Sequence, residues 1–379
     1  MNVYFDNAST TKVRDEAIAA MVRVMSVDYG NPSSTHFAGR YAAAVLSGAR
    51  GKVAAALGAD PDEVYFTSGG TESDNWAVLC SAEAAQRQGK HIITSSAEHD
   101  AVLSPVKKLS TMGWEVTYLQ PDAAGRVPVK DFTEALRSDT ILASIMLVNN
   151  ETGAVNPVNE YSAEIRKRKL KTILHTDAVQ GFCKIPFSVQ SLGADLISVS
   201  AHKIHGPKGA GALYIRRGMK LPQMIYGGSQ ESGRRAGTEA LPAIAGFGEA
   251  ASHAASEASS TAEEIRKLRG RIIESLKREL PETVFIGEGD SPYIISLSLP
   301  GHRSEVLMSA LEGEGICVAR SAACKKGERS RVLEAMRLGD DVINGALRVS
   351  LSRYNTSEEA DYFANALVKT SSKIIRNRR

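Results

Sequence analysis

The sequence is poor in several features that define whole classes of protein. Its 379 residues include only four cysteines, too few for a disulfide framework, and no two have the CxxC spacing of a zinc or redox site. No apolar run approaches the ~18 residues that a membrane span needs, and the first residues lack the basic and apolar regions of a signal peptide. The formal net charge is only +3, which gives no electrostatic case for nucleic acid or an anionic membrane. These absences predict a cytoplasmic, reduced protein with no membrane partner and no direct nucleic-acid partner.

What is present is the composition of an ordinary globular protein, 43% hydrophobic and 23% charged. From about residue 40 to residue 215, amphipathic helical stretches alternate with short runs rich in β-branched and aromatic residues. The expected strands are 63–67, 91–94, 115–119, 141–148, 172–176, 196–200 and 212–215. Strands that alternate with helices predict an α/β fold with a mainly parallel, seven-stranded sheet. Such sheets bind ligands beyond the carboxyl ends of their strands.

A long charged helical stretch, residues 249–280, connects this region to the rest of the chain. After it the order changes to strand, helix, strand, strand and helix, which predicts a second, smaller α/β domain. We therefore expect a large domain of residues 14–255 and a small domain formed by residues 1–13 and 256–379.

One lysine stands at an unusual place in this pattern. The expected strand 196–200 runs directly into Ala201-His202-Lys203 and then into a Gly/Pro turn. A desolvated lysine at the carboxyl end of a strand is a nucleophile suited to forming a Schiff base. For an arbitrary lysine, the ordinary interpretation is a solvated loop residue.

Two other strand ends carry matching chemistry. The strand 172–176 is followed by Asp177, whose carboxylate suits either the nitrogen of a pyridine ring or a helix N-cap. The strand 63–67 is followed by Ser68-Gly69-Gly70-Thr71 at the start of a helix, where glycines and free N–H groups bind phosphate. No Gly-Lys-Ser/Thr follows, so this is not a Walker loop. A phosphate cradle, an aspartate and a lysine together indicate pyridoxal 5'-phosphate.

With these motifs the sequence resembles the cysteine desulfurases, a family of fold-type I pyridoxal phosphate enzymes within the class V aminotransferase group. The resemblance extends from Asp6-Asn7-Ala8-Ser9-Thr10-Thr11 to Arg348-Val349-Ser350-Leu351-Ser352-Arg353-Tyr354. The block Ser200-Ala201-His202-Lys203 with Gly206-Pro207-Lys208-Gly209 is highly specific for that group. The resemblance implies an enzyme that converts L-cysteine to L-alanine and passes the sulfur, as a persulfide, to an acceptor protein for iron–sulfur cluster assembly or tRNA thiolation.

The resemblance also implies a role for each matching residue. Lys203 would bind the cofactor covalently and later carry the proton at the substrate Cα, while His99 would stack on the ring and shuttle protons. Asp177 would pair with the ring nitrogen. Asn150 and Arg348 would bind the substrate carboxylate, to which the planar guanidinium offers two donors. The full set of implied cofactor ligands is Gly70, Thr71, His99, Asn150, Asp177, Gln180, Ser200, His202, Lys203 and Thr238.

Two members of this set carry specific implications. Gln180 would form a hydrogen bond with the ring oxygen O3′. Thr238 would reach the phosphate of a partner subunit, which implies a homodimer with shared active sites. His99 and Arg348 also have ordinary interpretations, as a satisfied polar side chain and as a surface ion pair. No metal site is expected.

Cys324 decides which reaction is expected. It stands in a small, polar stretch beside an arginine and two lysines, which favour the thiolate that attacks sulfur. The alternative is an exposed thiol without a function. Cys80 and Cys317 have apolar neighbours, which predicts inert core thiols. The family's longer-loop branch usually reads Ser-Gly-Ser-Ala-Cys, whereas this chain has Arg320-Ser321-Ala322-Ala323-Cys324, without the glycine.

Three rival functions stay open at this point. A selenocysteine lyase would depend less on Cys324, another class V aminotransferase such as a transaminase would yield a keto acid, and a sulfur-transfer scaffold would have no turnover. The basic segments 166–171 and 376–379 are typical of a solvated helix end and a frayed tail. Docking of an acidic acceptor protein is the alternative for these segments.

Overall fold

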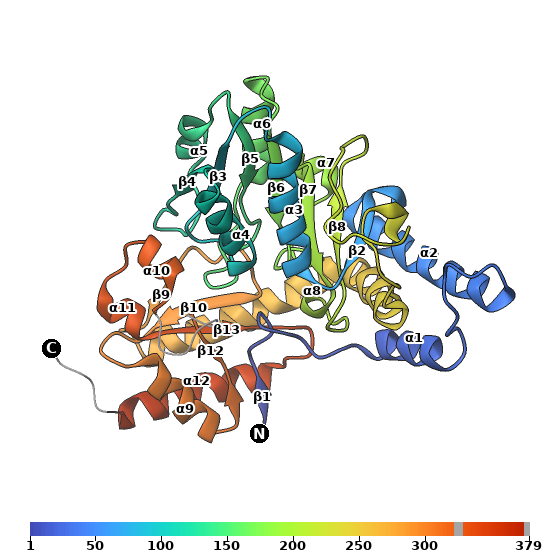
Figure 1. The fold of residues 1–379 in the computed structure, drawn as a ribbon. Helices are drawn as coiled ribbons and strands as arrows, with labels where there is room; N and C mark the ends of the chain where they lie inside the picture. The colour runs from blue at the N-terminus through green and yellow to red at the C-terminus, as the bar shows by residue number, and fades with distance from the viewer. Residues whose placement is uncertain (322–328, 375–379) are drawn as a thin grey trace.

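The computed structural model describes residues 1–321 and 329–374, and Cys324 lies outside them. Its larger part is a seven-stranded sheet with the order β2-β8-β7-β6-β5-β3-β4 (Figure 1). In this sheet β8 is antiparallel to both neighbours and the other strand pairs are parallel. The strands are β2 (Val64–Thr67), β3 (His91–Ser95), β4 (Glu115–Leu119), β5 (Thr140–Ser144), β6 (Ile173–Asp177), β7 (Leu196–Ser200) and β8 (Gly211–Ile215). The predicted mainly parallel, seven-stranded sheet is confirmed.

Helices cover both faces of this sheet, so its central strands are buried and rich in apolar residues, as parallel strands are. On one face α3 (Gly70–Ala85) packs across β5 to β8 and beside α4 (Asp100–Thr111). On the other face, Phe182 and Phe66 pack edge to face against Phe247. The remaining helices of this part are α1 (Asp15–Ser26), α2 (Phe37–Leu57), α5 (Val129–Ala135), α6 (Val158–Lys167) and α7 (Val189–Leu192).

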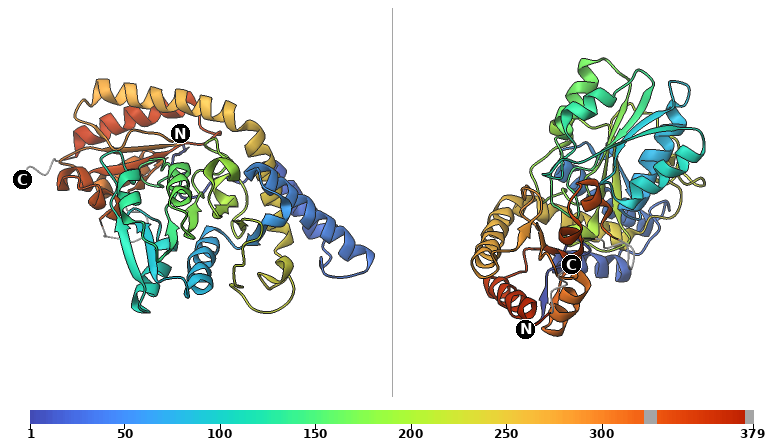
Figure 2. Two further views of the ribbon diagram at one scale, coloured as in Figure 1. Left: turned by 90° about the horizontal axis from the view of Figure 1, so that it is seen from above. Right: turned by 90° about the vertical axis from the view of Figure 1, so that its left-hand side faces the viewer.

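The second sheet is antiparallel and has the order β12-β13-β10-β9. Its strands are β9 (Val284–Phe285), β10 (Ile294–Ser298), β12 (Ala319–Arg320) and β13 (Ala346–Ser350). Its helices are α9 (Ser304–Gly313), α10 (Arg331–Ala335), α11 (Asp340–Asn344) and α12 (Ser357–Lys373). The long helix α8 (Leu241–Glu279) joins the two parts, because its first half packs on α1 and α2 and it also packs on α12 (Figure 2).

The N-terminal arm, residues 5–12, lies between the two sheets. It follows β1 (Val3–Tyr4), which pairs in parallel with β11 (Ile316–Cys317). The backbone N–H of Ser350 donates to Phe5 O at 2.7 Å, and farther along the N–H of Thr11 donates to His202 O at 3.0 Å. The arm therefore ties the antiparallel sheet to the carboxyl end of β7.

Three sequence expectations need correction. The expected strand 141–148 ends at Ser144, because the chain then turns back so that Val148 bridges Val155. The second of the strands expected after the long helical stretch is two short strands, β11 and β12. Cys317 is exposed rather than buried, because side chains alternate along β11 and Ile316 is the inward one. Within residues 1–321 and 329–374, no helix has both the length and the apolar character to cross a membrane.

Candidate active site

A glycine-lined helix N-terminus lies where β2 turns into α3. The helix begins at Gly70, and its first N–H groups have no partners within the helix. A Cβ atom on Gly70 would lie 2.8 Å from a Val179 methyl and 3.8 Å from the Ser200 Cβ, so only glycine fits here. Thr71 is exposed beside it. The structure therefore brings the predicted residues Gly70, Thr71 and Ser200 to one place.

Ser200 supplies the clearest sign that this cradle takes a ligand. Its residue is 1% exposed, and its Oγ has no hydrogen-bond partner among the described residues. A buried hydroxyl without a partner is costly, so a phosphate oxygen fits the site. Nearby, His202 Nδ1 lies 3.2 Å from Thr10 Oγ1, and burial followed by the charge of Lys203 lowers the pKa of His202 to about 4. The imidazole is therefore neutral and offers one N–H donor.

Lys203 ends a short 3-10 helix, Ala201–Lys203, directly after β7. Its Nζ donates to the carbonyl oxygens of Ala8, at 2.6 Å, and Ser9, at 2.9 Å. Gln180 Nε2 donates to the same Ala8 oxygen at 2.8 Å. The lysine amine is thus held inside the site by the N-terminal arm, and it is not a solvated loop lysine.

Asp177 is the last residue of β6 and is 6% exposed. Its Oδ1 accepts a hydrogen bond from Val179 N at 2.9 Å, so the capping contact expected of an aspartate after a strand is present. Burial raises the pKa of Asp177, the buried Asp74 raises it further, and His99 opposes the rise. A protonated ring nitrogen beside this carboxylate would favour its charged form. The donor set at the rim of the sheet therefore fits pyridoxal 5'-phosphate.

His99 is the N-cap of α4, and its Nδ1 accepts the Ala101 N–H at 3.1 Å. This contact satisfies one ring nitrogen and leaves Nε2 for another partner. The preceding residue, Glu98, is a buried carboxyl that sequence reasoning missed. It accepts from Ser95 Oγ at 2.8 Å and Met146 N at 2.9 Å, and burial raises its pKa to about 8.

Arg348 lies in the middle of β13 and is 2% exposed, so it does not form an ion pair on the surface. Its Nη1 donates to the backbone oxygen of Asn150 at 2.9 Å. Its Nη2 donates to Asp6 Oδ1 at 2.9 Å and to Ser9 Oγ at 2.7 Å. Because Ser9 also accepts from Lys203, the structure brings the predicted carboxylate-binding residues, Arg348 and Asn150, to the arm that holds the lysine.

Thr238 stands apart from the other predicted ligands. It is exposed, and in the part of the chain that the structure describes no hydrogen bond joins it to them. Its loop is anchored to the same cradle, because Arg235 Nε donates to Glu72 Oε1 at 2.8 Å. Arg50 also donates twice to the buried Glu231, at 2.7 Å each. Thr238 therefore faces outward from a firmly held loop.

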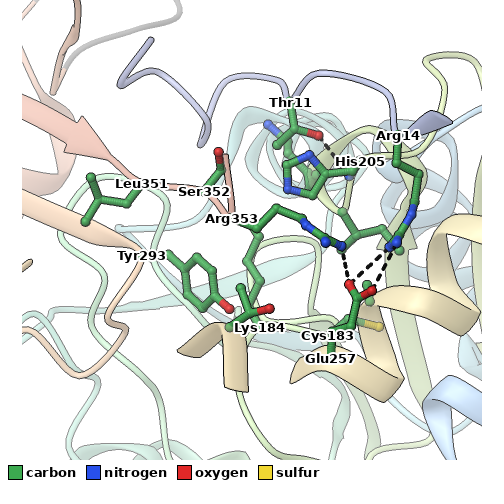
Figure 3. A pocket seen from close by; sticks show the side chains of 14 residues that line it. Thr11, Arg14, Cys183, Lys184, His205, Glu257, Tyr293, Leu351, Ser352 and Arg353 are labelled. Atoms are coloured by element: carbon green, nitrogen blue, oxygen red, sulfur yellow. Dashed lines mark hydrogen bonds and ion pairs between the residues drawn. The ribbon is translucent and has the colours of Figure 1, made fainter. Parts of the chain in front are cut away.

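A cavity opens behind Lys203, where the arm, α8 and the end of β13 meet (Figure 3). Glu257 bridges Arg14 and Arg353 on its wall. Lys184 and Tyr293 lie on the other side. Among the residues placed by the structure, no group of three or more histidine, cysteine or acidic side chains is arranged to hold a metal ion.

A lysine, an aspartate and a phosphate cradle at the carboxyl edge of a mainly parallel sheet define a pyridoxal phosphate-dependent enzyme of fold type I. The family described as aminotransferase class-V matches residues 3–363. The chain is 44% identical over 363 residues to cysteine desulfurase IscS of Methanosarcina thermophila, covering 95% of this chain and 89% of that protein.

Solved structures agree with this relationship. A NifS-like protein superposes with a TM-score of 0.94 at 39% identity, covering 99% of this chain and all of that one. The structure of SspA in complex with cysteine superposes with a TM-score of 0.82 at 31% identity, covering 94% of this chain and 100% of that one. The chain belongs to the class-V aminotransferase family and, within it, to the cysteine desulfurases. Neither a selenocysteine lyase nor a transaminase is favoured by these relatives.

Proposed function

We propose that the protein takes sulfur from L-cysteine, releases L-alanine and carries the sulfur as a persulfide on Cys324. The observation that supports this most is the meeting of Lys203 and Arg348 at the arm residue Ser9. Lys203 moves a proton at the substrate Cα, and Arg348 binds the substrate carboxylate. Such a site orients an amino acid with its side chain free to react.

The residues of this chain divide the work. Bound pyridoxal 5'-phosphate supplies an electron sink for the Cα–H bond. Lys203 moves the Cα proton, Asp177 holds the proton on the ring nitrogen, and His99 offers Nε2 as a second proton carrier. Gly70, Thr71, Ser200 and His202 hold the phosphate, while Gln180 donates to O3′ and Asn150 lies beside the carboxylate site.

The sulfur step balances without an outside oxidant. The Cys324 thiolate attacks the substrate sulfur, so an S–S bond forms as the substrate Cβ–S bond breaks. The electron pair of that bond stays with the carbon fragment, which takes up protons and leaves as alanine. The persulfide then passes to an acceptor protein that serves iron–sulfur cluster assembly or tRNA thiolation. Thiolate chemistry of this kind favours a reducing, cytoplasmic location.

The deciding experiment compares two cysteine variants. Cys324→Ala is expected to stay yellow but to lose alanine release, by about 100-fold or more, as expected when a nucleophile is removed. Cys317→Ala is the matched control, because Cys317 is an exposed thiol on a strand and should retain full turnover. Normal alanine release from Cys324→Ala would contradict the proposal. Selenide release retained in that variant, with sulfide release lost, would favour the selenocysteine lyase.

The proposal includes a homodimer in which Thr238 reaches the partner's phosphate. Its support is a concentration of exposed apolar residues on the amino-terminal helices and the loop between them, which project from the body (Figures 1 and 2). These residues are Ile18, Val22, Met25, Tyr29, Phe37 and Tyr41, all 44% to 75% exposed. Exposed large apolar side chains gathered in one segment favour an interaction site. A second copy would cover it.

Val22→Asp is expected to give monomers in sedimentation experiments. Val306→Asp is the control, because Val306 is comparably exposed, at 43%, on the distant helix α9. A dimer unaffected by Val22→Asp would contradict this surface. We also propose the division into residues 14–255 and residues 1–13 with 256–379, supported by two separate apolar cores, of which one includes the first half of α8 and the other its second half.

A further inference from the structure

Lys184 lies on the wall of the cavity behind Lys203, and the proposed reaction gives it no role (Figure 3). It follows β6 on the turn that also carries Gln180. No ion pair within residues 1–321 and 329–374 includes Lys184. Burial, with the nearby charges of Lys203 and Arg348, lowers its pKa to about 7. Burial and nearby positive charges disfavour a charged amine at this position, so the presence of a lysine here calls for a specific contact that uses it.

Its hydrogen bond supplies one. Lys184 Nζ donates to Gln180 Oε1 at 3.3 Å. On the other side of the same amide, Gln180 Nε2 donates to Ala8 O at 2.8 Å, and that oxygen also accepts from Lys203. A glutamine side chain has one oxygen and an NH2 group with two donors. With the oxygen on Lys184 and one N–H on Ala8, one N–H is left over.

A flipped amide would fill the same space with the oxygen and nitrogen exchanged. It would then set its oxygen against the Ala8 carbonyl and its NH2 group against the Lys184 ammonium. A carbonyl oxygen only accepts and an ammonium only donates, so the flip loses both hydrogen bonds. The two neighbours therefore hold the amide in one orientation.

We propose that Lys184 is a positioning residue, which fixes the Gln180 amide so that its spare N–H, rather than its oxygen, is presented to the ring oxygen of the cofactor. This inference rests on the proposed role of Gln180. The inference explains what selects the orientation of the Gln180 amide, because a glutamine side chain by itself has no preference between its two flipped orientations. Without Lys184, part of the population would turn the amide oxygen toward the ring oxygen, and the two would repel each other.

The test is a double-mutant cycle on the affinity for pyridoxal 5'-phosphate, measured by refilling cofactor-free protein at about pH 6.5, where the amine is mostly protonated. Lys184→Met and Gln180→Ala should each weaken binding by about ten-fold, the size of one hydrogen bond to a charged group. Lys184→Met should add nothing in the Gln180→Ala background, because one residue acts through the other. Each single variant should also raise the pH midpoint of the cofactor's visible absorbance.

Two further variants keep the test sharp. Lys184→Arg retains a donor and should restore affinity to within about three-fold. Lys12→Met makes the same substitution on the exposed part of the arm, where Lys12 contacts Tyr354, and should bind as the unchanged protein does. Thermal unfolding of each cofactor-free variant shows that it is folded.

The outcomes separate the two proposals. If Gln180→Ala weakens binding but Lys184→Met does not, or if the two effects add, Lys184 does not position the amide and the inference is overturned. If Gln180→Ala changes neither affinity nor spectrum, the proposed contact of Gln180 with O3′ is wrong, and the role of Lys184 fails with it.

Discussion

Two regions line the site, and they differ in how their buried polar atoms are satisfied. The strand-end rim, which carries Asp177, Ser200 and Lys203, has gaps in its hydrogen bonding. Ser200 Oγ has no hydrogen-bond partner among the described residues, and neither has the buried Glu98 Oε2. Several hydrogen bonds join the N-terminal arm to β13, although Arg348 Nε has no partner among the described residues.

The difference indicates two kinds of construction. Buried polar groups without partners are rare in folded proteins and indicate a missing ligand, so the rim is built to be completed by the cofactor. The arm and β13 form a wall whose hydrogen bonds fix the position of Arg348, and within it Arg348 Nε is left without a partner among the described residues. Substitutions in the rim should therefore act mainly on cofactor and chemistry, and substitutions in the arm should act on substrate position and stability.

The largest effect is expected at the rim. Lys203→Ala should lower alanine release by about 10⁴-fold, the upper end of what one positioned acid–base group contributes. Borohydride treatment followed by mass spectrometry should find no cofactor attached to the chain. Lys12→Ala is the control and should retain both. Alanine release near the normal rate from Lys203→Ala would show that Lys203, and with it the rim, does not take part in the reaction.

Arg348→Lys retains the positive charge and tests whether the geometry of the arginine, which the arm fixes, is needed to bind the substrate. Lysine cannot reproduce the two-pronged contact with Asn150 O, Asp6 and Ser9. We expect KM for cysteine to rise by about 100-fold, the cost of a misplaced substrate, while the cofactor's spectrum stays unchanged. Arg353→Lys, on the more exposed pair with Glu257, is the control. A spectrum altered as strongly as KM would mean that the two regions are not distinct.

The rim could be predicted from the sequence and the wall could not, for a physical reason. Parallel strand ends meet at one edge whatever the details of packing, so Asp177 and Lys203 could be placed together from local patterns. Arg348 is brought to the site by hydrogen bonds between Asn7 and Ser350, which are 343 residues apart. Local patterns carry no such information, and only the resemblance pointed to Arg348.

The remaining misses also have causes. Glu98 was overlooked because carboxylates are almost never fully buried without a cation, and only the structure shows its burial. Cys317 was expected to be buried from its neighbours, but in a two-residue strand the alternation of side chains decides which one faces out. Cys324 stays a prediction from the sequence, because it lies outside the described residues.

Glu98 gives the rim a pH dependence with a definite sign. Its folded-state pKa of about 8 lies above the usual value of 4.5, so the folded protein keeps a proton that the unfolded chain releases. The free energy of unfolding therefore falls as pH rises between those values. Glu98→Gln cannot ionise, so its free energy of unfolding should rise relative to that of the unchanged protein by about 3 kcal/mol between about pH 5 and pH 8.

Urea unfolding of the cofactor-free protein at the two pH values measures this difference. Glu134→Gln, which changes an exposed glutamate of α5, is the control and should leave the pH dependence as it was. A Glu98→Gln variant that loses stability equally at both pH values would show that Glu98 acts through packing alone. Glu98 would then no longer support the contrast between the rim and the arm.

The smallest expected effect compares two serines that are equally buried, at 1% exposure each. Ser350 Oγ accepts from Ala8 N at 2.8 Å and donates to Phe5 O at 3.1 Å. Ser350→Ala leaves Ala8 N without its partner, although Phe5 O keeps the hydrogen bond from Ser350 N. The variant should therefore lower the free energy of unfolding by about 1–3 kcal/mol. Ser200→Ala removes a hydroxyl that has no partner among the described residues, so it should leave the cofactor-free protein as stable or more stable. Its affinity for pyridoxal 5'-phosphate should nevertheless fall by about ten-fold. Equal losses of stability in both variants would mean that Ser200 is bonded within the protein, and that the gap in the rim does not await a ligand.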